Sequence, residues 1–251
     1  MISYLAVEPH DRILDIGCGD GQLTAQIAAS ASSGAVLGLD ASPSFISTAK
    51  SRHSTDNCSF REHDCTRLSS CPEAVNGEWD KVFSNAALHW ILRNSNTRKD
   101  VFRDVHRALK PDGMFVFEMG GKGNVDEVHA AVLAALVSHG VPIDQARDAC
   151  PWFFPSVDWM KPALEEAGFV VEKVESEYRP TKCTSKSADG LGGLEGWIRL
   201  MCADMLAAVD ESKRDGVVKQ ACDTLETIVT REEDGSQWIG YVRLRAVARK
   251  Q

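Results

Sequence analysis

Short apolar runs alternate with segments of helical spacing along the first half of the chain. The apolar runs predict buried strands at residues 13–16, 35–40, 58–62, 79–85 and 114–119. Between the last two, apolar positions recur with a helical period from Thr97 to Leu109, and Lys110-Pro111-Asp112-Gly113 predicts the end of that helix. Strands that alternate with helices predict a parallel, doubly wound α/β sheet.

The pattern changes after residue 125. Helices are predicted at 125–139, 157–167, 194–209 and 212–230, with Ser156 as the N-cap of the second and Gly168 at its end. A Gly/Ser-rich loop covers Ser185–Gly193. A sixth strand is predicted at 169–174, and residues 237–250 alternate as a last strand with one face formed by Trp238, Gly240, Val242, Leu244, Ala246 and Ala248.

A glycine-rich turn follows the first predicted strand. Gly17, Gly19 and Gly21 separate Ile16 from a helix that starts near Leu23. Glycine lets a ligand approach the backbone, and a helix start offers free N–H groups, so a nucleotide-like ligand is expected at this sheet edge. The dinucleotide pattern G-x-G-x-x-G would need a glycine where Gln22 stands, which argues against an NAD-dependent oxidoreductase.

An acid closes the second predicted strand, and another follows the third. Asp40 lies about 20 residues beyond the glycine turn, a position that suits the hydroxyls of a ribose. Ser42 and Pro43 then predict the start of a helix that runs to Lys50. Asp64 follows the third strand, where it caps the next helical turn or binds a ligand.

Composition narrows the class of protein. The chain has 251 residues and a net charge of −8, with no basic run, so neither nucleic acid nor a membrane is expected as a partner. The N-terminus lacks the pattern of a signal peptide, which favours a cytoplasmic protein. None of the eight cysteines forms a C-x-x-C pair, so reduced thiols and no metal site are expected.

Several motifs in order resemble class I S-adenosylmethionine (SAM) methyltransferases over residues 11–121. They are D-x-G-x-G-x-G from Asp15, the acid Asp40, H-D-C at 63–65, S-N-A-A-L-H-W at 84–90 and L-K-P-D-G at 109–113. The N-A-A-L-H-W segment resembles small-molecule enzymes of the trans-aconitate methyltransferase type, with malonyl-carrier-protein and juvenile-hormone-acid methyltransferases as wider relatives.

The resemblance implies one Rossmann-like domain over residues 1–251. Its sheet has seven mostly parallel strands, with the last antiparallel between the fifth and sixth and a helical cap at about 184–230 inserted before it. Residues 1–121 would form the cofactor half and 122–251 the substrate half. The family usually carries one more helix before the first strand, over the cofactor; here a short segment stands there, so an incomplete cover is expected.

The cofactor implied is SAM, with S-adenosylhomocysteine as product. Asp15 would lie near the amino-acid end of the cofactor, Asp64 would accept a bond from the adenine amino group, and the Cys65 backbone would lie beside the ring. The alternative role for Asp64 is the helix cap. The full set of cofactor residues expected is Asp15, Gly17, Cys18, Gly19, Gly21, Asp40, Ala41, Asp64, Cys65, Asn85 and Ala86.

The methyl acceptor is expected to be a small molecule, most simply an organic acid methylated on oxygen, with the enzyme a monomer or homodimer. His89 is either a general base or a side chain that binds backbone, and Arg199 either clamps a carboxylate or is a surface residue. Further candidates for the acceptor site are Trp90, Lys122 and Trp197. A carboxylate acceptor needs no base, whereas a hydroxyl or amine does. A non-catalytic binding module of the same fold remains the other alternative.

Overall fold

The computed structural model describes residues 1–185 and 192–251, which form two compact units. The first unit contains Met1–Gly121, Phe153–Ser176 and Arg243–Gln251, and the second contains Lys122–Trp152 and Glu177–Val242. Most of the predicted Ser185–Gly193 loop lies outside the described residues. The assignment of 1–121 to a cofactor half and 122–251 to a substrate half, with a cap at about 184–230, stays a prediction.

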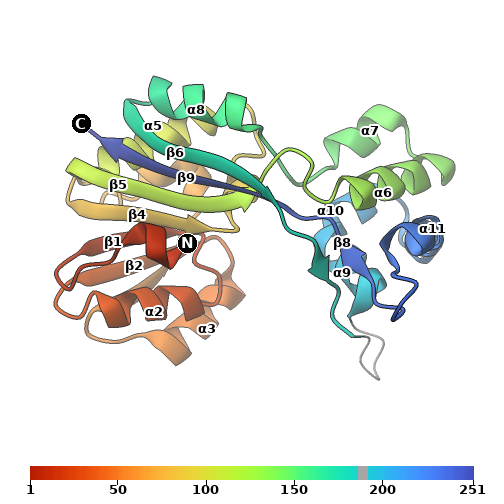
Figure 1. The fold of residues 1–251 in the computed structure, drawn as a ribbon, viewed down its shortest axis with the longest axis horizontal. Helices are drawn as coiled ribbons and strands as arrows, with labels where there is room; N and C mark the ends of the chain where they lie inside the picture. Colours follow the sequence, from red (N-terminus) through yellow and green to blue (C-terminus); the bar gives the residue numbers. More distant parts are fainter. Residues whose placement is uncertain (186–191) are drawn as a thin grey trace. The chain divides into compact units, whose positions relative to one another are not determined.

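A seven-stranded sheet runs through the first unit (Figure 1). Its strand order is β3-β2-β1-β4-β5-β9-β6, with parallel pairing from β3 to β5 and β9 antiparallel to β5. The predicted α/β fold and the place of the last strand are therefore confirmed. The strands are β1 Arg12–Ile16, β2 Ala35–Asp40, β3 Cys58–Glu62, β4 Trp79–Asn85, β5 Leu109–Gly120, β6 Phe169–Tyr178 and β9 Val242–Lys250.

Helices cover both faces of this sheet. Two predicted N-caps are confirmed, because Ser42 Oγ accepts from Phe45 N at 3.3 Å and Ser156 Oγ accepts from Trp159 N at 3.2 Å. The helices of the first unit are α1 Ile2–Leu5, α2 Gln22–Ser30, α3 Pro43–His53, the 3₁₀ helix η1 Cys65–Ser70, α4 Leu88–Ile91, α5 Arg98–Ala108 and α8 Val157–Glu166.

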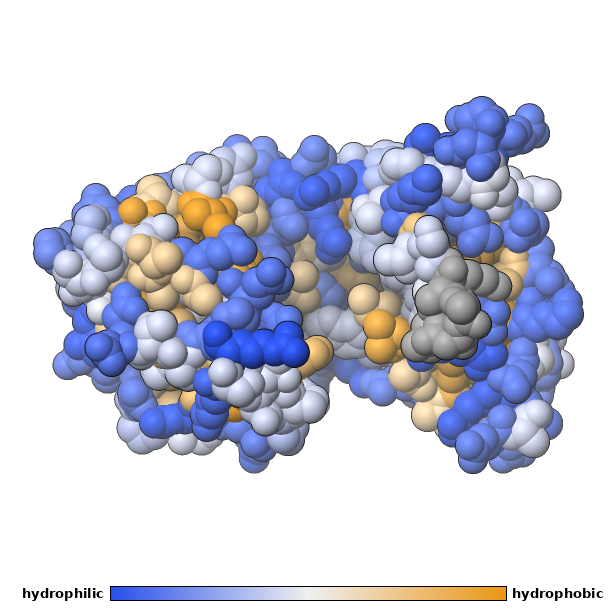
Figure 2. All heavy atoms as spheres, turned by 90° about the horizontal axis from the view of Figure 1, so that it is seen from below, coloured by the Kyte–Doolittle hydropathy of each residue, from blue (hydrophilic) through white to orange (hydrophobic). Residues whose placement is uncertain are grey.

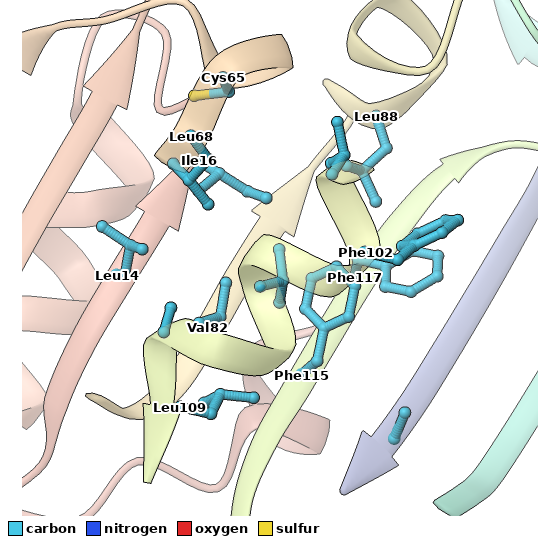
Figure 3. Packing of buried hydrophobic residues seen from close by; sticks show 14 of the residues in the cluster. Leu14, Ile16, Cys65, Leu68, Val82, Leu88, Phe102, Leu109, Phe115 and Phe117 are labelled. Atoms are coloured by element: carbon cyan, nitrogen blue, oxygen red, sulfur yellow. The ribbon is translucent and has the colours of Figure 1, made fainter. Parts of the chain in front are cut away.

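Alternate strand residues supply two hydrophobic cores, one on each face of the sheet. Phe115 and Phe117 of β5 pack with α5 and α8 in the core drawn in Figure 3, whereas Val116 between them packs with α2 and α3. Leu14 and Ile13 of β1 divide in the same way. This alternation is the period-two geometry of a strand, and it explains why central strands buried on both faces are continuous apolar runs in the sequence.

The second unit is built mainly of helices. α11 packs against α6 and α9, and a separate two-stranded antiparallel sheet joins β7 to β8. Within the described ranges 1–185 and 192–251, no helix has the length and hydrophobicity needed to cross a membrane. The elements are α6 Asp126–Ser138, α7 Ile143–Asp148, β7 Thr181–Lys182, α9 Gly193–Met201, α10 Ala203–Leu206, α11 Glu211–Val229 and β8 Trp238–Ile239.

Three predicted boundaries are wrong. The helix expected at 194–209 divides at Cys202 into α9 and α10, and β5 begins at Leu109 with an irregularity opposite Trp79, ahead of the predicted start at residue 114. The strand expected at 237–250 is interrupted after Ile239, since Gly240 N donates to Glu127 and Val242 N donates to Asn124 Oδ1. Side chains from outside the sheets take these backbone groups, so β8 and β9 end in different sheets.

Candidate cofactor site

The glycine turn after β1 is held by the neighbouring strand. Gly17 N and Cys18 N both donate to Leu39 O of β2, at 2.7 and 2.9 Å, and Gly21 N donates to Cys18 O at 3.1 Å. All three glycines have positive φ, at 77°, 56° and 81° for Gly17, Gly19 and Gly21. The turn therefore needs the backbone freedom that the sequence pattern predicts.

The three glycines are required for different physical reasons. A Cβ on Gly17 would collide with Ala87, and one on Gly21 would lie 2.7 Å from the Phe60 ring, so these two positions allow close packing. A Cβ on Gly19 would meet no atom within 4 Å. Gly19 thus faces open space, and the bare backbone at that residue is available to a ligand.

Asp40, at the end of β2, is fixed by two backbone donors. Its Oδ2 accepts from Gly19 N at 2.9 Å, and its Oδ1 accepts from Ser42 N at 2.9 Å. The side chain is half-buried and lines the cavity described below. Because a carboxylate oxygen accepts more than one hydrogen bond, each oxygen keeps capacity for a ligand hydroxyl.

Asp15, within β1, lies at the floor of the same region and is buried. Thr24 Oγ1 donates to Asp15 Oδ2 at 2.6 Å. Burial raises the pKa of Asp15 to about 7, since the Thr24 bond, which lowers it, only partly offsets burial and the nearby Asp40 charge raises it further. A cationic group placed beside this carboxyl would favour its ionised form.

The end of β4 forms the opposite wall. Ala86 follows Asn85 with φ 56°, an unusual conformation for a residue with a Cβ, and Ala86 N donates to Glu118 O at 2.8 Å. Ser84 Oγ donates to Ile16 O at 2.7 Å and ties β4 to β1. These bonds fix the chain direction at 85–87, where the backbone enters the cavity wall.

Two adjoining cavities, each of about 310 Å³, lie at these strand ends. Of the predicted cofactor residues, those that line one or both are Asp15, Gly17, Cys18, Gly19, Asp40, Ala41, Cys65, Asn85 and Ala86. Gly21 and Asp64 are not among the lining residues, whereas Trp90, predicted for the acceptor, is. Burial raises the pKa of both the Cys18 and the Cys65 thiols, which therefore stay protonated at neutral pH.

Several lining residues were not predicted from the sequence. They are Asp20, Gln22, Leu23, Phe45, Ala87 and Ile91. Phe45 of α3 and Trp90 of α4 line both cavities, although they are 50% and 39% exposed. Exposed aromatic rings at a cavity offer stacking surfaces for a flat ligand ring. The available signal for Phe45 was an aromatic residue on the solvent side of a predicted helix start.

Asp64 has the geometry of a helix cap. Its Oδ1 accepts from Thr66 N at 3.0 Å and from Thr66 Oγ1 at 2.7 Å, directly before η1. Partial burial acts to raise the pKa of Asp64, but these bonds and the Arg67 and His63 charges lower it overall. The capping interpretation is therefore seen, and an additional contact to an adenine amino group stays a prediction.

His89 is buried in α4 and already has a partner. Gly120 N donates to His89 Nδ1 at 3.3 Å, and the ring centroid lies 5.6 Å from that of Phe154. Burial, together with the Arg243 charge, lowers the pKa of His89 to about 3. At neutral pH the ring is uncharged and Nδ1 accepts, so the single ring proton is on Nε2. His89 can donate a hydrogen bond from Nε2 and has no free nitrogen to take a proton.

The remaining predicted acceptor residues belong to the second unit. Arg199 of α9 forms ion pairs with Glu195 and Asp215, at 3.0 and 2.9 Å. Trp197 Nε1 donates to Tyr241 Oη at 2.6 Å, and Lys122 is exposed. Glu195 and Asp215 therefore already hold the Arg199 guanidinium, as the surface interpretation expected.

Known methyltransferases match the chain in sequence. A methyltransferase domain family matches residues 13–113. An uncharacterized methyltransferase of Schizosaccharomyces pombe is 33% identical over 251 residues, which cover 100% of this chain and 91% of that protein. A malonyl-[acyl-carrier protein] O-methyltransferase of Geobacter sulfurreducens is 32% identical over 69% of this chain and 62% of its own length. A trans-aconitate 2-methyltransferase of Deinococcus radiodurans is 36% identical over 33% of this chain and 29% of its own length.

Solved structures show the same fold. The YcgJ protein of Bacillus subtilis superposes with a TM-score of 0.63 at 17% identity, covering 100% of this chain and 96% of that chain. A SAM-dependent methyltransferase of Anabaena variabilis superposes with a TM-score of 0.57 at 15% identity, covering 98% of this chain and 80% of that chain.

The residues of the first unit fit SAM, the cofactor that this family implies. Gly19 leaves open space beside bare backbone, Asp40 ends β2 with spare acceptor capacity, and Asp15 provides a buried carboxyl at the same cavity. The nicotinamide alternative has no support in these relatives. On its relative of nearly full length, its domain match and its fold, the chain belongs to the class I SAM-dependent methyltransferases.

Proposed function

We propose that this enzyme transfers a methyl group from SAM to a carboxylate oxygen of a small organic acid. The observation that carries the acid is the state of His89. Its Nδ1 accepts from Gly120 N, and its pKa is lowered to about 3, so it is not a base at neutral pH. A carboxylate is already ionised at neutral pH and needs none. The names of two relatives, a malonyl-carrier-protein and a trans-aconitate methyltransferase, support the same acceptor class.

The chain's own residues bind and orient the cofactor in this proposal. Asp40 accepts from the ribose hydroxyls, the open backbone at Gly19 lies against the ligand, and ionised Asp15 attracts the ammonium of the amino-acid end. Bound SAM supplies a methyl group made electrophilic by its positively charged sulfur. Catalysis is then mainly the alignment of acceptor and methyl and the exclusion of water.

Residues of both units are proposed for the acceptor. Trp90 shapes the wall of the cofactor cavity, and His89 acts as a hydrogen-bond donor that fixes the acceptor's orientation. Lys122, Trp197 and Arg199 are the candidates in the second unit. A clamp by Arg199 would require its guanidinium to exchange Glu195 or Asp215 for the substrate carboxylate. We propose small molecules, rather than nucleic acid, as partners of a chain with net charge −8.

An acceptor screen with methyl-labelled SAM tests the proposal. Small carboxylic acids are compared with the amides and primary alcohols of the same skeletons, and ester products are recognised by the release of label as methanol in alkali. We expect label on acids alone, an Arg199→Met variant with a raised KM, and a His89→Gln variant with kcat lowered less than about tenfold, since proton abstraction is not required.

The opposite pattern contradicts the proposal. If alcohols or amines are methylated and His89→Gln lowers kcat by about 100-fold or more, the acceptor needs a base and the acid assignment is wrong. If the chain binds S-adenosylhomocysteine and methylates nothing in any class, the alternative of a non-catalytic binding module replaces the enzyme.

A further inference from the structure

A cavity of about 510 Å³ lies within the second unit. Helix α9 contributes Trp197, Leu200 and Met201 to its wall, and the small sheet of β7 and β8 contributes Ile239, with Tyr241 just beyond it. The volume is in the range of small-molecule sites, which is about 300–1,000 Å³. The candidate acceptor residue Trp197 is thus part of a larger built cavity.

The wall of this cavity is apolar and partly fixed. Trp197 is held by the bond from its Nε1 to Tyr241 Oη at 2.6 Å, and its ring centroid lies 6.2 Å from that of Trp152. Lys182 is the one charged side chain among the described lining residues. The surroundings therefore suit an uncharged, apolar group and offer little to a second carboxylate.

Leu200 indicates that the cavity is incomplete without a ligand. It lines the cavity and yet is 74% exposed, more than the other large apolar residues of the described chain. Figure 2 shows hydrophobic residues gathered at the surface of the second unit. A leucine that faces an apolar cavity and remains in contact with water gains from any apolar group placed over it.

The side-chain directions along α9 separate this cavity from Arg199. Trp197, Leu200 and Met201 face the cavity, whereas Arg199 pairs with Glu195 and Asp215 and is not among the lining residues. The spacing 197, 200 and 201 is that of one helix face. The helix thus has one face for apolar contacts and another for ion pairs.

We infer that this cavity binds the apolar body of the methyl acceptor, so that the substrates are carboxylic acids carrying an alkyl chain or an aromatic ring. This inference rests on the proposed function and narrows its substrate class. The carboxylate remains the group methylated, and the cavity of the second unit holds the rest of the molecule. Selectivity then comes from the length and shape of the apolar body.

A series of straight-chain acids from acetate to decanoate tests the inference in the methyl-transfer assay. While added methylenes fill the cavity, kcat/KM should rise about threefold to fourfold for each. Leu200→Lys, which places a charge in the cavity, should flatten this dependence. The matched control is Ile228→Lys, in which another apolar residue of the second unit, 64% exposed and outside the cavity lining, receives the same charge and should keep the wild-type slope.

A dye titration gives a second readout that needs no cofactor. N-phenyl-1-naphthylamine, a neutral apolar dye, should bind the wild-type and Ile228→Lys chains with increased fluorescence and bind Leu200→Lys at least tenfold more weakly. Equal dye affinity for both variants would overturn the inference.

The outcomes separate the inference from the proposed function. Acids methylated with no dependence on chain length overturn the inference and leave acid methylation standing. If acids are not substrates but alkyl alcohols or amines are, with the same slope and the same loss in Leu200→Lys, the acid is wrong and the role of the cavity is supported.

Discussion

The cavities of the two units differ in what builds them. In the first unit the cofactor cavity is made largely of backbone, in the turn at Gly17–Gly21 and in the ends of β2 and β4. In the second unit the cavity is made of side chains, chiefly Trp197, Leu200 and Met201 on one helix face. A site made of backbone requires particular residues at fixed spacing, whereas a site made of side chains needs only apolar residues that happen to meet. The first kind is visible in a sequence and the second is not.

The largest expected effect comes from closing the backbone-built cavity at Gly19. Gly19→Val places a side chain in open space beside the ligand and should weaken S-adenosylhomocysteine binding by at least about 100-fold in titration calorimetry. Gly140→Val is the control, since Gly140 also has positive φ and no atom within 4 Å of a Cβ, but lies in the second unit. Equal affinity in the two variants would break the comparison.

Removing the Asp40 carboxylate tests the strand-end acid. Asp40→Ala should weaken S-adenosylhomocysteine binding by roughly 1.5–3 kcal/mol, or about 10- to 150-fold, because charged hydrogen bonds to the ribose are lost. The analogue that lacks both ribose hydroxyls should bind wild type and variant alike. An analogue that still discriminates between them would show that Asp40 acts only through Gly19 N and Ser42 N.

Asp15 should make cofactor affinity depend on pH. Its pKa of about 7 means that below neutrality a proton must leave before the ligand ammonium is bound. Affinity for S-adenosylhomocysteine should therefore rise with pH, by up to about tenfold per unit below 7, and level off above 7. Calorimetry from pH 5.5 to 8 measures this, and Asp15→Asn should remove the slope. A slope that persists in the variant would assign the proton to another group.

The smallest expected effect concerns Phe45, a side-chain contribution to the backbone-built cavity. Phe45→Ala should weaken S-adenosylhomocysteine binding about 2- to 10-fold through lost stacking. Tyr178→Ala removes another aromatic side chain, 67% exposed and outside the lining of both cofactor cavities, and should bind as wild type does. Matching losses in both variants would mean that Phe45 makes no specific contact.

Local rules predicted most of the first unit. The glycine spacing, the acid at the end of β2, the Ser42 and Ser156 caps and the order of the strands each depend on a few neighbouring residues or on the period of a strand or helix. The place of the last strand between β5 and β6 came from the family resemblance.

Long-range partners explain what the sequence did not show. His89 is neutral because it is buried and accepts from Gly120 N, 31 positions along the chain, and the break between β8 and β9 depends on Glu127 and Asn124. Phe45 and Ile91 line one cavity although 46 positions separate them, so their meeting follows from the folded sheet. The division at Cys202 and the face of α9 that borders the second cavity likewise depend on packing.

Titration calorimetry of the intact chain with S-adenosylhomocysteine, with NAD⁺ titrated in parallel, tests the central claim most directly. The site at Gly19, Asp40 and Asp15 predicts saturable binding of one S-adenosylhomocysteine per chain, unaffected by an excess of NAD⁺. No binding of S-adenosylhomocysteine, or its displacement by NAD⁺, would contradict the account.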